Sequence, residues 1–164
     1  MNIFNTLPDY SRVWIYASTG KLSPEQSSDV QNLLDGFAKA WTSHQQQLNA
    51  KAALVKSHFL VFMVDESAAE ISGCGIDKSV QLVKEIEQKT GLSFFNRLNI
   101  HLEIENEVHI FNRQQLDKAI EEGLVNENTH FFDNLVQTKG DFIENWLKPV
   151  NKSWIWSKIK TLSA

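Results

Sequence analysis

Two segments of the chain carry apolar side chains at both alternating positions, which predicts strands buried on both faces. Residues 12–17, RVWIYA, are rich in β-branched and aromatic side chains. Residues 59–64, FLVFMV, have the same character. Residues 52–56 precede them across a tight turn at Ser57 and His58, so we expect a β-hairpin whose second strand lies in the interior of a sheet.

A period of 3.6 residues predicts an amphipathic helix over residues 24–43. Ser23 and Gln26 have the spacing of a capping box, with Pro24 between them at the first helical position. The apolar residues that form one stripe of this helix are Val30, Leu33, Leu34, Phe37 and Trp41.

A second helix is predicted over residues 77–90, with Asp77 as its N-cap and Gly91 after its last residue. Apolar and polar residues then alternate over 98–104, as in a strand with one exposed face. A three-residue turn over 105–107 would keep the apolar side chains of both hairpin strands together, and it would place His109 opposite Glu103.

The first six elements run β-α-β-β-α-β, the split order of ferredoxin-like domains, in which the strands at 12–17 and 59–64 are central. We therefore predict a single α+β domain over residues 1–164, with a mainly antiparallel sheet and the helices 24–43 and 77–90 on one face. A helix over 113–122 and a C-terminal helical and aromatic extension follow. The extension should cover the second face, because exposed apolar area costs about 25 cal/mol per Å².

Composition narrows the classes of function. Sixteen basic and twenty acidic residues give a net charge of −4, which argues against a nucleic-acid partner because the phosphate backbone would be repelled. No apolar run is long enough to span a bilayer, and the first residues have no charged and apolar regions typical of a secretory signal. The single cysteine agrees with a reducing compartment. We expect a cytoplasmic protein without a membrane segment.

The candidate ligand-binding loop, residues 65–79, joins the end of a buried strand to the start of a helix. Its candidate residues are Asp65, Glu66, Ser72, Cys74, Asp77 and Ser79, together with His44. Glycines flank Cys74 and would let the backbone approach a ligand, and a thiol near helix amides gains thiolate character. Cys74 could then act as a nucleophile with His44 or His58 as base. The more common alternative, which we prefer, is a buried and unreactive cysteine beside a turn.

The sequence assigns no metal and no cofactor. Oxygen ligands from Asp65, Glu66 and Asp77 would suit Mg²⁺, but neighbouring residues of a strand point to opposite faces. We prefer a helix cap for Asp77 and a solvated Glu66. None of the five histidines has the i, i+4 spacing of a zinc-binding helix.

Tryptophans gather at the end of the chain. We interpret Trp146 as a lid over the sheet and treat Trp154 and Trp156 as a candidate interaction surface. Residues 153–162 should form a short helix with one apolar face, made of Trp154, Ile155, Ile159 and Leu162. We expect Trp154 to pack on the domain itself.

Five segments carry a resemblance to a known family: SRVWIY at 11–16, WTSH at 41–44, VDES at 64–67, SGCGID at 72–77 and NLVQTKG at 134–140. Together they resemble an uncharacterised family of Bacteroidetes-type bacteria, and the resemblance spans nearly the whole chain. Members of that family are often labelled "ABC transporter ATPase". The chain has no G-x-x-x-x-G-K-[ST] and no glycine-rich transporter signature, so its motifs do not support that activity.

Two functions remain open at this point. One is a small-ligand-binding or enzymatic domain that uses the 65–79 loop, which we favour because no structural need explains so polar and glycine-rich a segment. The other is a non-catalytic interaction module that uses the C-terminal aromatic segment. A pocket at the loop would support the first, and a filled loop beside an exposed apolar patch the second. The substrate, the partner and the oligomeric state are not specified by the sequence.

Overall fold

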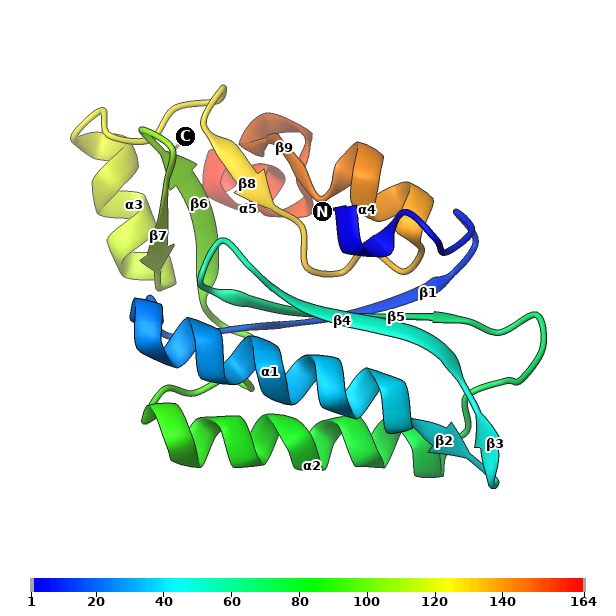
Figure 1. Cartoon of the computed structure of the whole chain (residues 1–164). Coiled ribbons are helices and arrows are strands. Elements are labelled where there is room, and N and C mark those ends of the chain that lie inside the picture. The colour runs from blue at the N-terminus through cyan, green and yellow to red at the C-terminus, as the bar shows by residue number, and fades with distance from the viewer. Residues whose placement is uncertain (1, 164) are drawn as a thin grey trace.

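The computed structural model describes residues 2–163, with side chains over 3–159, and it is a mixed α+β protein with antiparallel sheets (Figure 1). In chain order the elements are η1 (Asn2–Phe4), β1 (Arg12–Ala17), α1 (Pro24–Ala40), β2 (Thr42–Ser43), β3 (Gln46–Gln47), β4 (Asn49–Val55), β5 (Phe59–Asp65), α2 (Gly73–Thr90), β6 (Ile100–Ile104), β7 (Glu107–Phe111), α3 (Arg113–Glu121), β8 (His130–Phe132), α4 (Lys139–Asn145), β9 (Leu147–Pro149), η2 (Val150–Lys152) and α5 (Trp154–Ser163).

The first sheet has the order β1-β5-β4, and both pairings are antiparallel. Strand β5 is central, as its double-sided apolar pattern predicts, and residues 59–64 are all 0% exposed. Strand β1 is its neighbour, with Trp14 opposite Phe62 and Tyr16 opposite Leu60. The prediction that β1 is also central is wrong, because β1 lies at the edge of this sheet.

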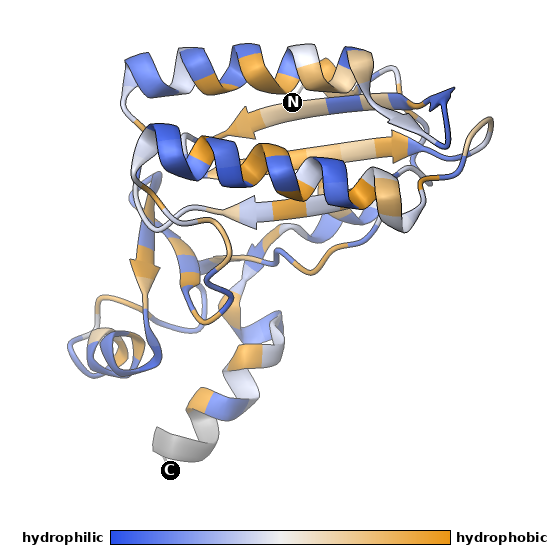
Figure 2. Cartoon of the chain, turned by 90° about the horizontal axis from the view of Figure 1, so that it is seen from below, coloured by the Kyte–Doolittle hydropathy of each residue, from blue (hydrophilic) through white to orange (hydrophobic). Residues whose placement is uncertain are grey.

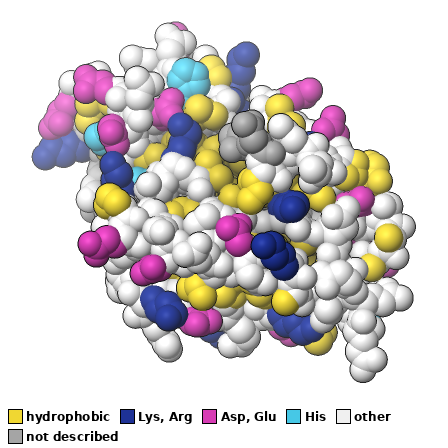
Figure 3. Space-filling model, viewed as in Figure 1, with side chains coloured by type: hydrophobic (Ala, Val, Ile, Leu, Met, Phe, Trp, Pro, Cys, Tyr) yellow, Lys and Arg dark blue, Asp and Glu magenta, His cyan; other side chains and the backbone are white. Residues whose placement is uncertain are grey.

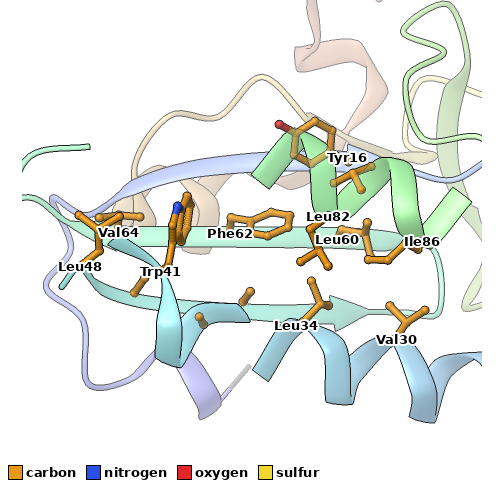
Figure 4. Packing of buried hydrophobic residues seen from close by; sticks show 14 of the residues in the cluster. Tyr16, Val30, Leu34, Trp41, Leu48, Leu60, Phe62, Val64, Leu82 and Ile86 are labelled. Atoms are coloured by element: carbon orange, nitrogen blue, oxygen red, sulfur yellow. The ribbon is translucent and has the colours of Figure 1, made fainter. Parts of the chain in front are cut away.

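Even-numbered and odd-numbered residues of β5 pack on different layers. Leu60, Phe62 and Val64 face α1 and α2, which lie side by side under the sheet (Figure 1), so the prediction that both helices cover one face is confirmed. Outward-facing residues of the two helices are mostly hydrophilic in the view from below (Figure 2). Helix α1 ends at Ala40 rather than 43, because Trp41 turns to an extended backbone and buries its indole beside Phe62 (Figure 4).

The odd-numbered residues of β5 meet the N-terminal segment and the C-terminal third of the chain. Phe59 contacts the edge of Trp146, whose ring centroid is 5.1 Å away, and Trp146 is 4% exposed. Phe4 packs edge-on against Phe142 from the same layer. The predicted cover of the second face, with Trp146 as a lid, is therefore confirmed. Lys139 at the start of α4 is buried and donates to the carbonyl of Leu7 at 2.6 Å, which ties the N-terminal segment down.

The sixth element does not join the first sheet. Strand β6 pairs with β7 and β8 in a second sheet of order β7-β6-β8-β9. A ferredoxin-like domain would place this strand beside β1, so the ferredoxin-like order is not confirmed. The second sheet has its own apolar cluster, in which Leu102 and Phe131 pack against α3 and α5.

The hairpin between β6 and β7 also differs from the prediction. Glu105 and Asn106 form a two-residue turn with positive φ at both positions, the pattern of a type I′ turn. His109 consequently pairs with Leu102 and not with Glu103. Two further hairpin turns have positive φ at both central residues without a glycine, at 44–45 and at 56–57.

The C-terminal segment forms the predicted helix, α5, which extends away from the layer of the first sheet (Figure 2). Its anchors are Ile155 and Ile159, which are 2% and 3% exposed in the cluster of the second sheet. Trp154 is 50% exposed, so the prediction that it is buried against the domain is wrong. The side chain of Leu162, the last member of the predicted stripe, lies outside the described residues. Within residues 2–163, no helix is both long and apolar enough to cross a membrane.

Strand β6 places a histidine between the two sheets. His101 is 2% exposed, and its Nε2 lies 2.9 Å from the carbonyl of Ser18, so Nε2 carries the proton and donates it. The Nδ1 atom is buried and has no partner among the described residues. Protonation would therefore place a second N–H where nothing accepts it. Burial lowers the pKa of His101, the neighbouring His58 lowers it further, and the bond to Ser18 opposes both effects.

Burial lowers the pKa of His58 as well, so the folded protein should lose stability as the pH falls through 6.5, the value for the unfolded chain. Above 6.5 both forms hold the rings neutral, and below it only the unfolded chain takes up the protons readily. Urea unfolding on either side of this pH measures the loss. The free energy of unfolding of the His101→Gln variant should fall less on acidification than that of the wild type. His109→Gln, at an exposed position, should show the same fall as the wild type. A ring NMR titration of His101 at the ordinary pKa in the native protein would contradict the expectation.

Candidate functional site

The acidic residues at the start of the 65–79 loop accept hydrogen bonds from backbone amides of the same loop. Asp65 accepts a hydrogen bond from the backbone amide of Ser67 at 2.9 Å, which lowers the pKa of Asp65. Glu66 accepts from the amide of Ile71 at 3.1 Å and forms an ion pair with Arg12 at 3.3 Å. Among the described residues, no group of three or more His, Cys, Asp or Glu side chains could hold a metal ion.

Helix α2 begins at Gly73, four residues before the predicted start. Its N-cap is Ser72, whose hydroxyl accepts from the amide of Gly75. Asp77 is exposed on the second turn, so the prediction that Asp77 caps the helix is wrong. Ser79 is buried, and its hydroxyl donates to the carbonyl of Ile76 at 2.6 Å. A serine cap therefore replaces the aspartate cap.

The glycine at position 75 has a structural explanation. The indole N–H of Trp41 donates to the carbonyl of Gly75 at 2.9 Å, and the hydroxyls of Ser43 and Ser72 lie 2.6 Å apart. A Cβ atom at Gly75 would come within 2.8 Å of Ile71 and 3.3 Å of Ser43. The polar, glycine-rich sequence thus docks the start of α2 on the end of α1.

The structure does not bring the proposed nucleophile and base together as a buried site. Cys74 is exposed, which makes the prediction of a largely buried thiol wrong. His44 is exposed in the turn between β2 and β3, and His58 is buried with its Nδ1 2.8 Å from the carbonyl of Lys56. Neither of the clefts described next is lined by a residue of the 65–79 loop.

A cleft of about 350 Å³ lies where β6 diverges from β1, and we call it the edge cleft. It is lined by residues 15–17, 94–101, 113, 131, 132, 134, 135, 154, 155 and 158. A second cleft, of about 520 Å³, follows β1 from Arg12 to Tyr16 and shares Ile15, Tyr16, Arg97 and the 134–135 segment with the edge cleft. The two clefts together follow one edge of the first sheet.

Hydrogen bonds close the edge of β1 at both ends and leave its middle open. At one end the amide of Val13 donates to the carbonyl of Gln137 at 3.0 Å, and at the other His101 donates to Ser18. In an antiparallel pair successive residues direct their backbone groups alternately toward and away from the partner strand. Val13 therefore points away from β5, and so do Ile15 and Ala17. No backbone bond outside the helix and strand ladders of the described residues reaches these two.

Aromatic and aliphatic side chains form the walls of the edge cleft. Tyr16 packs edge-on between Phe62 and Phe95, with ring centroids 5.7 and 5.6 Å away. Phe94 is 3% exposed and fixes the start of the 94–99 loop by donating its amide to Glu87 at 2.8 Å. Of the exposed large apolar residues among those described, four line this cleft: Phe95, Leu98, Leu135 and Trp154.

The charge of the two clefts is one-sided. Their described lining residues include Arg12, Arg97, Arg113 and Lys158 but no aspartate or glutamate. Arg12 and Arg113 have carboxylate partners, whereas no ion pair within the described residues involves Arg97 or Lys158. On the face seen in Figure 3, by contrast, acidic and basic side chains are interspersed. Although the chain has a net charge of −4, the charged side chains that line these two clefts among the described residues are all positive.

Sequence reasoning missed most of this site. Of its candidate residues only Trp154 lines the edge cleft, while Trp156 is partly buried against the cluster of the second sheet. Leu98 was expected in a strand, but β6 begins at Ile100 and Leu98 is 84% exposed. The alternating pattern over 98–104 therefore gave no local signal that Leu98 and the neighbouring Arg97 belong to a surface site.

Alanine substitution separates a glycine that a close contact requires, Gly75, from a glycine in open space, Gly36. Gly75→Ala should destabilise the protein by about 1 kcal/mol, because overpacking costs roughly 1–3 kcal/mol and the gain in helix propensity offsets less than that. Gly36→Ala, in the middle of α1 with nothing within 4 Å of the added Cβ, should stabilise it by about 0.5–1 kcal/mol. Urea unfolding of both variants provides the comparison. Equal stabilisation by the two substitutions would refute the close approach at Gly75.

Cys74, the single cysteine of the chain, should react with a thiol reagent in the native protein about as fast as in the unfolded protein. The physical reason is that its side chain is exposed at the start of α2, so labelling requires no opening of the fold. The ratio of the labelling rates without and with denaturant measures this. A native rate reduced by orders of magnitude would restore the buried interpretation.

Comparison of the chain with family models, with curated proteins and with solved structures gives no match. The resemblance inferred from the sequence segments therefore stays a prediction, and the geometry described above is the basis for any statement about function.

Proposed function

We propose that this protein binds a small anionic ligand with an apolar body, and that the edge cleft is the binding site. The observation that carries the proposal is a cleft of about 350 Å³ with apolar walls and with Arg97, Arg113 and Lys158 as its only charged lining residues among those described. Ligand pockets typically have this size and combine apolar walls with a few polar groups that orient the ligand. The cytoplasmic location expected from the sequence is part of the same proposal.

The closure of the cleft supports a small ligand rather than a protein partner. Val13 to Ser18 is about 17 Å of strand at about 3.3 Å per residue, and hydrogen bonds to Gln137 and His101 occupy both ends. A longer chain lying along β1 would collide with these closures. The exposed apolar residues Phe95, Leu98, Leu135 and Trp154 line the cleft itself and so belong to the same site.

The positive lining supports a negative ligand. Arg97 belongs to both clefts and has no ion-pair partner among the described residues, so its guanidinium is available to a carboxylate. Arginine binds carboxylates through two parallel hydrogen bonds, which are stronger than neutral ones. The ammonium of Lys158 lies 5.1 Å from the ring centre of Trp154, and both residues line the same cleft.

The proposed class of function, ligand binding, is therefore the same as the one favoured from the sequence, but the proposed site is at β1 and not at the 65–79 loop. That loop is held by its own hydrogen bonds and by Trp41 and Ser43. The alternative, an interaction module built on the C-terminal aromatic residues, loses its independent surface. Ile155 and Ile159 are buried against the second sheet, and Trp154 belongs to the lining of the cleft.

The test uses phenylpropanoate and its uncharged counterpart phenylpropanol as probes in isothermal titration calorimetry. Phenylpropanoate should bind, and the alcohol should bind about tenfold more weakly, because a charge-assisted hydrogen bond contributes about 1.5–3 kcal/mol. Arg97→Gln should remove this preference.

Lys84→Gln is the matched control, since it makes the same charge change on an exposed position of α2. It should leave both affinities unchanged. Equal binding of the acid and the alcohol, equal losses in the two variants, or no binding of either probe would overturn the proposed function.

A further inference from the structure

We propose that the ligand of the edge cleft is a peptide-like carboxylate, such as an N-acylated apolar amino acid, whose amide pairs with the open backbone of β1. This inference rests on the proposed function and narrows its ligand class. Three features of one site carry it: backbone groups that face the cleft, apolar walls, and an unpaired arginine. Each corresponds to one part of such a ligand.

The backbone of β1 supplies both a donor and an acceptor to the cleft. The alternation along β1, fixed by the bond of Val13 to Gln137, directs the N–H and C=O groups of Ile15 and Ala17 away from β5. Both residues line the edge cleft. A residue that adds to a sheet edge pairs through its own N–H and the carbonyl group that follows it, because the N–H and C=O of one trans amide point in opposite directions. In an N-acylated amino acid these groups are the amide N–H, which would donate to a β1 carbonyl, and the carboxylate, of which one oxygen would accept from a β1 N–H. A ligand with only a carboxylate would leave the carbonyls unpaired.

The other two features fix the ends of the ligand. Phe95 and Tyr16 contact each other and line the same cleft as Ile15 and Ala17, so they offer an apolar wall that suits an aromatic or aliphatic side chain. Arg97 lines both clefts together with Ile15, so a carboxylate attached next to the amide has a cation within the same site.

The length of the open edge limits the ligand to a short one. Residues 14–17 lie between the closures at Val13 and Ser18, so the edge has room for at most about four residues of extended chain, at about 3.3 Å per residue. An amino acid with one acyl group fits within this length. A peptide of six residues would have to displace Gln137 or His101, so we expect affinity to fall as residues are added on both sides.

Three probes separate this inference from the proposed function. N-acetylphenylalanine has the amide, the side chain and the carboxylate; N-acetyl-N-methylphenylalanine lacks the amide N–H; phenylpropanoate lacks the whole amide. We expect N-acetylphenylalanine to bind about fivefold more tightly than either of the others, because it alone has an amide N–H that can donate a backbone hydrogen bond to β1.

The outcomes are distinguishable. Equal affinity of all three probes, with loss of binding in Arg97→Gln, would overturn the peptide-like ligand and leave the proposed function standing. Absence of binding for all three would overturn both. Tight binding of the N-methylated probe would also overturn the inference, because its amide nitrogen cannot donate to β1.

Two-dimensional NMR of the complex locates the bonds. The amide protons of Ile15 and Ala17 should shift and become protected from exchange on addition of N-acetylphenylalanine. The amides of Trp14 and Tyr16, which already bond to β5, serve as internal controls. Protection of the controls alone would contradict the inference.

A proline at position 17 tests the same backbone group by substitution. Ala17→Pro removes an N–H that points away from β5 and therefore leaves the sheet ladder intact, the situation in which edge strands tolerate proline. It should weaken the binding of N-acetylphenylalanine about fivefold, because the ligand's carboxylate loses a backbone donor. Ala17→Gly keeps the N–H and should retain the affinity. Thermal unfolding of both variants confirms folding, and if the proline variant does not fold, the NMR shifts decide.

Discussion

The backbone of β1 can form hydrogen bonds on two sides, and along its middle only the side toward β5 is used. An unpaired strand edge is a liability in a folded protein, because it can pair with other chains. In this protein only the two ends of the edge are hydrogen-bonded. The amide of Val13 donates to the carbonyl of Gln137 at one end, and His101 donates to the carbonyl of Ser18 at the other. The rest of the molecule is arranged around the short gap that remains.

The second sheet follows from that arrangement. Since β6 leaves the position beside β1, it must find backbone partners elsewhere, and β7 and β8 supply them. Leu102 and Phe131 then need an apolar layer of their own, which α3 and α5 complete. The two sheets stay in contact through side chains such as Lys56 and Glu103, whose charged groups are 3.1 Å apart. The edge cleft lies between β1 and β6 because these two strands belong to different sheets and do not pair.

Local periodicity predicted the elements well and their partners poorly. The continuous apolar run over 59–64 identified β5 as a buried central strand, and the spacing of Val30 to Trp41 identified α1, because both patterns depend on near neighbours in the chain. The choice between β1 and β8 as the partner of β6 depends on contacts far apart in sequence, which no local pattern encodes. The hairpin turn at Glu105 and Asn106 was missed because both residues take positive φ without a glycine.

The loop residues that the sequence singled out have a structural role in the fold. Glycines and serines at 72–75 are the residues expected when a backbone must approach a ligand, but a backbone that must approach Trp41 and Ser43 needs the same residues. The groups on which the proposed binding site depends, in contrast, are the peptide units of Ile15 and Ala17, and every residue of a chain has a peptide unit. Sequence can mark side-chain chemistry, but whether a peptide group is left available depends on which strand lies beside it. The functional assignment of this protein therefore depends on the position of β6.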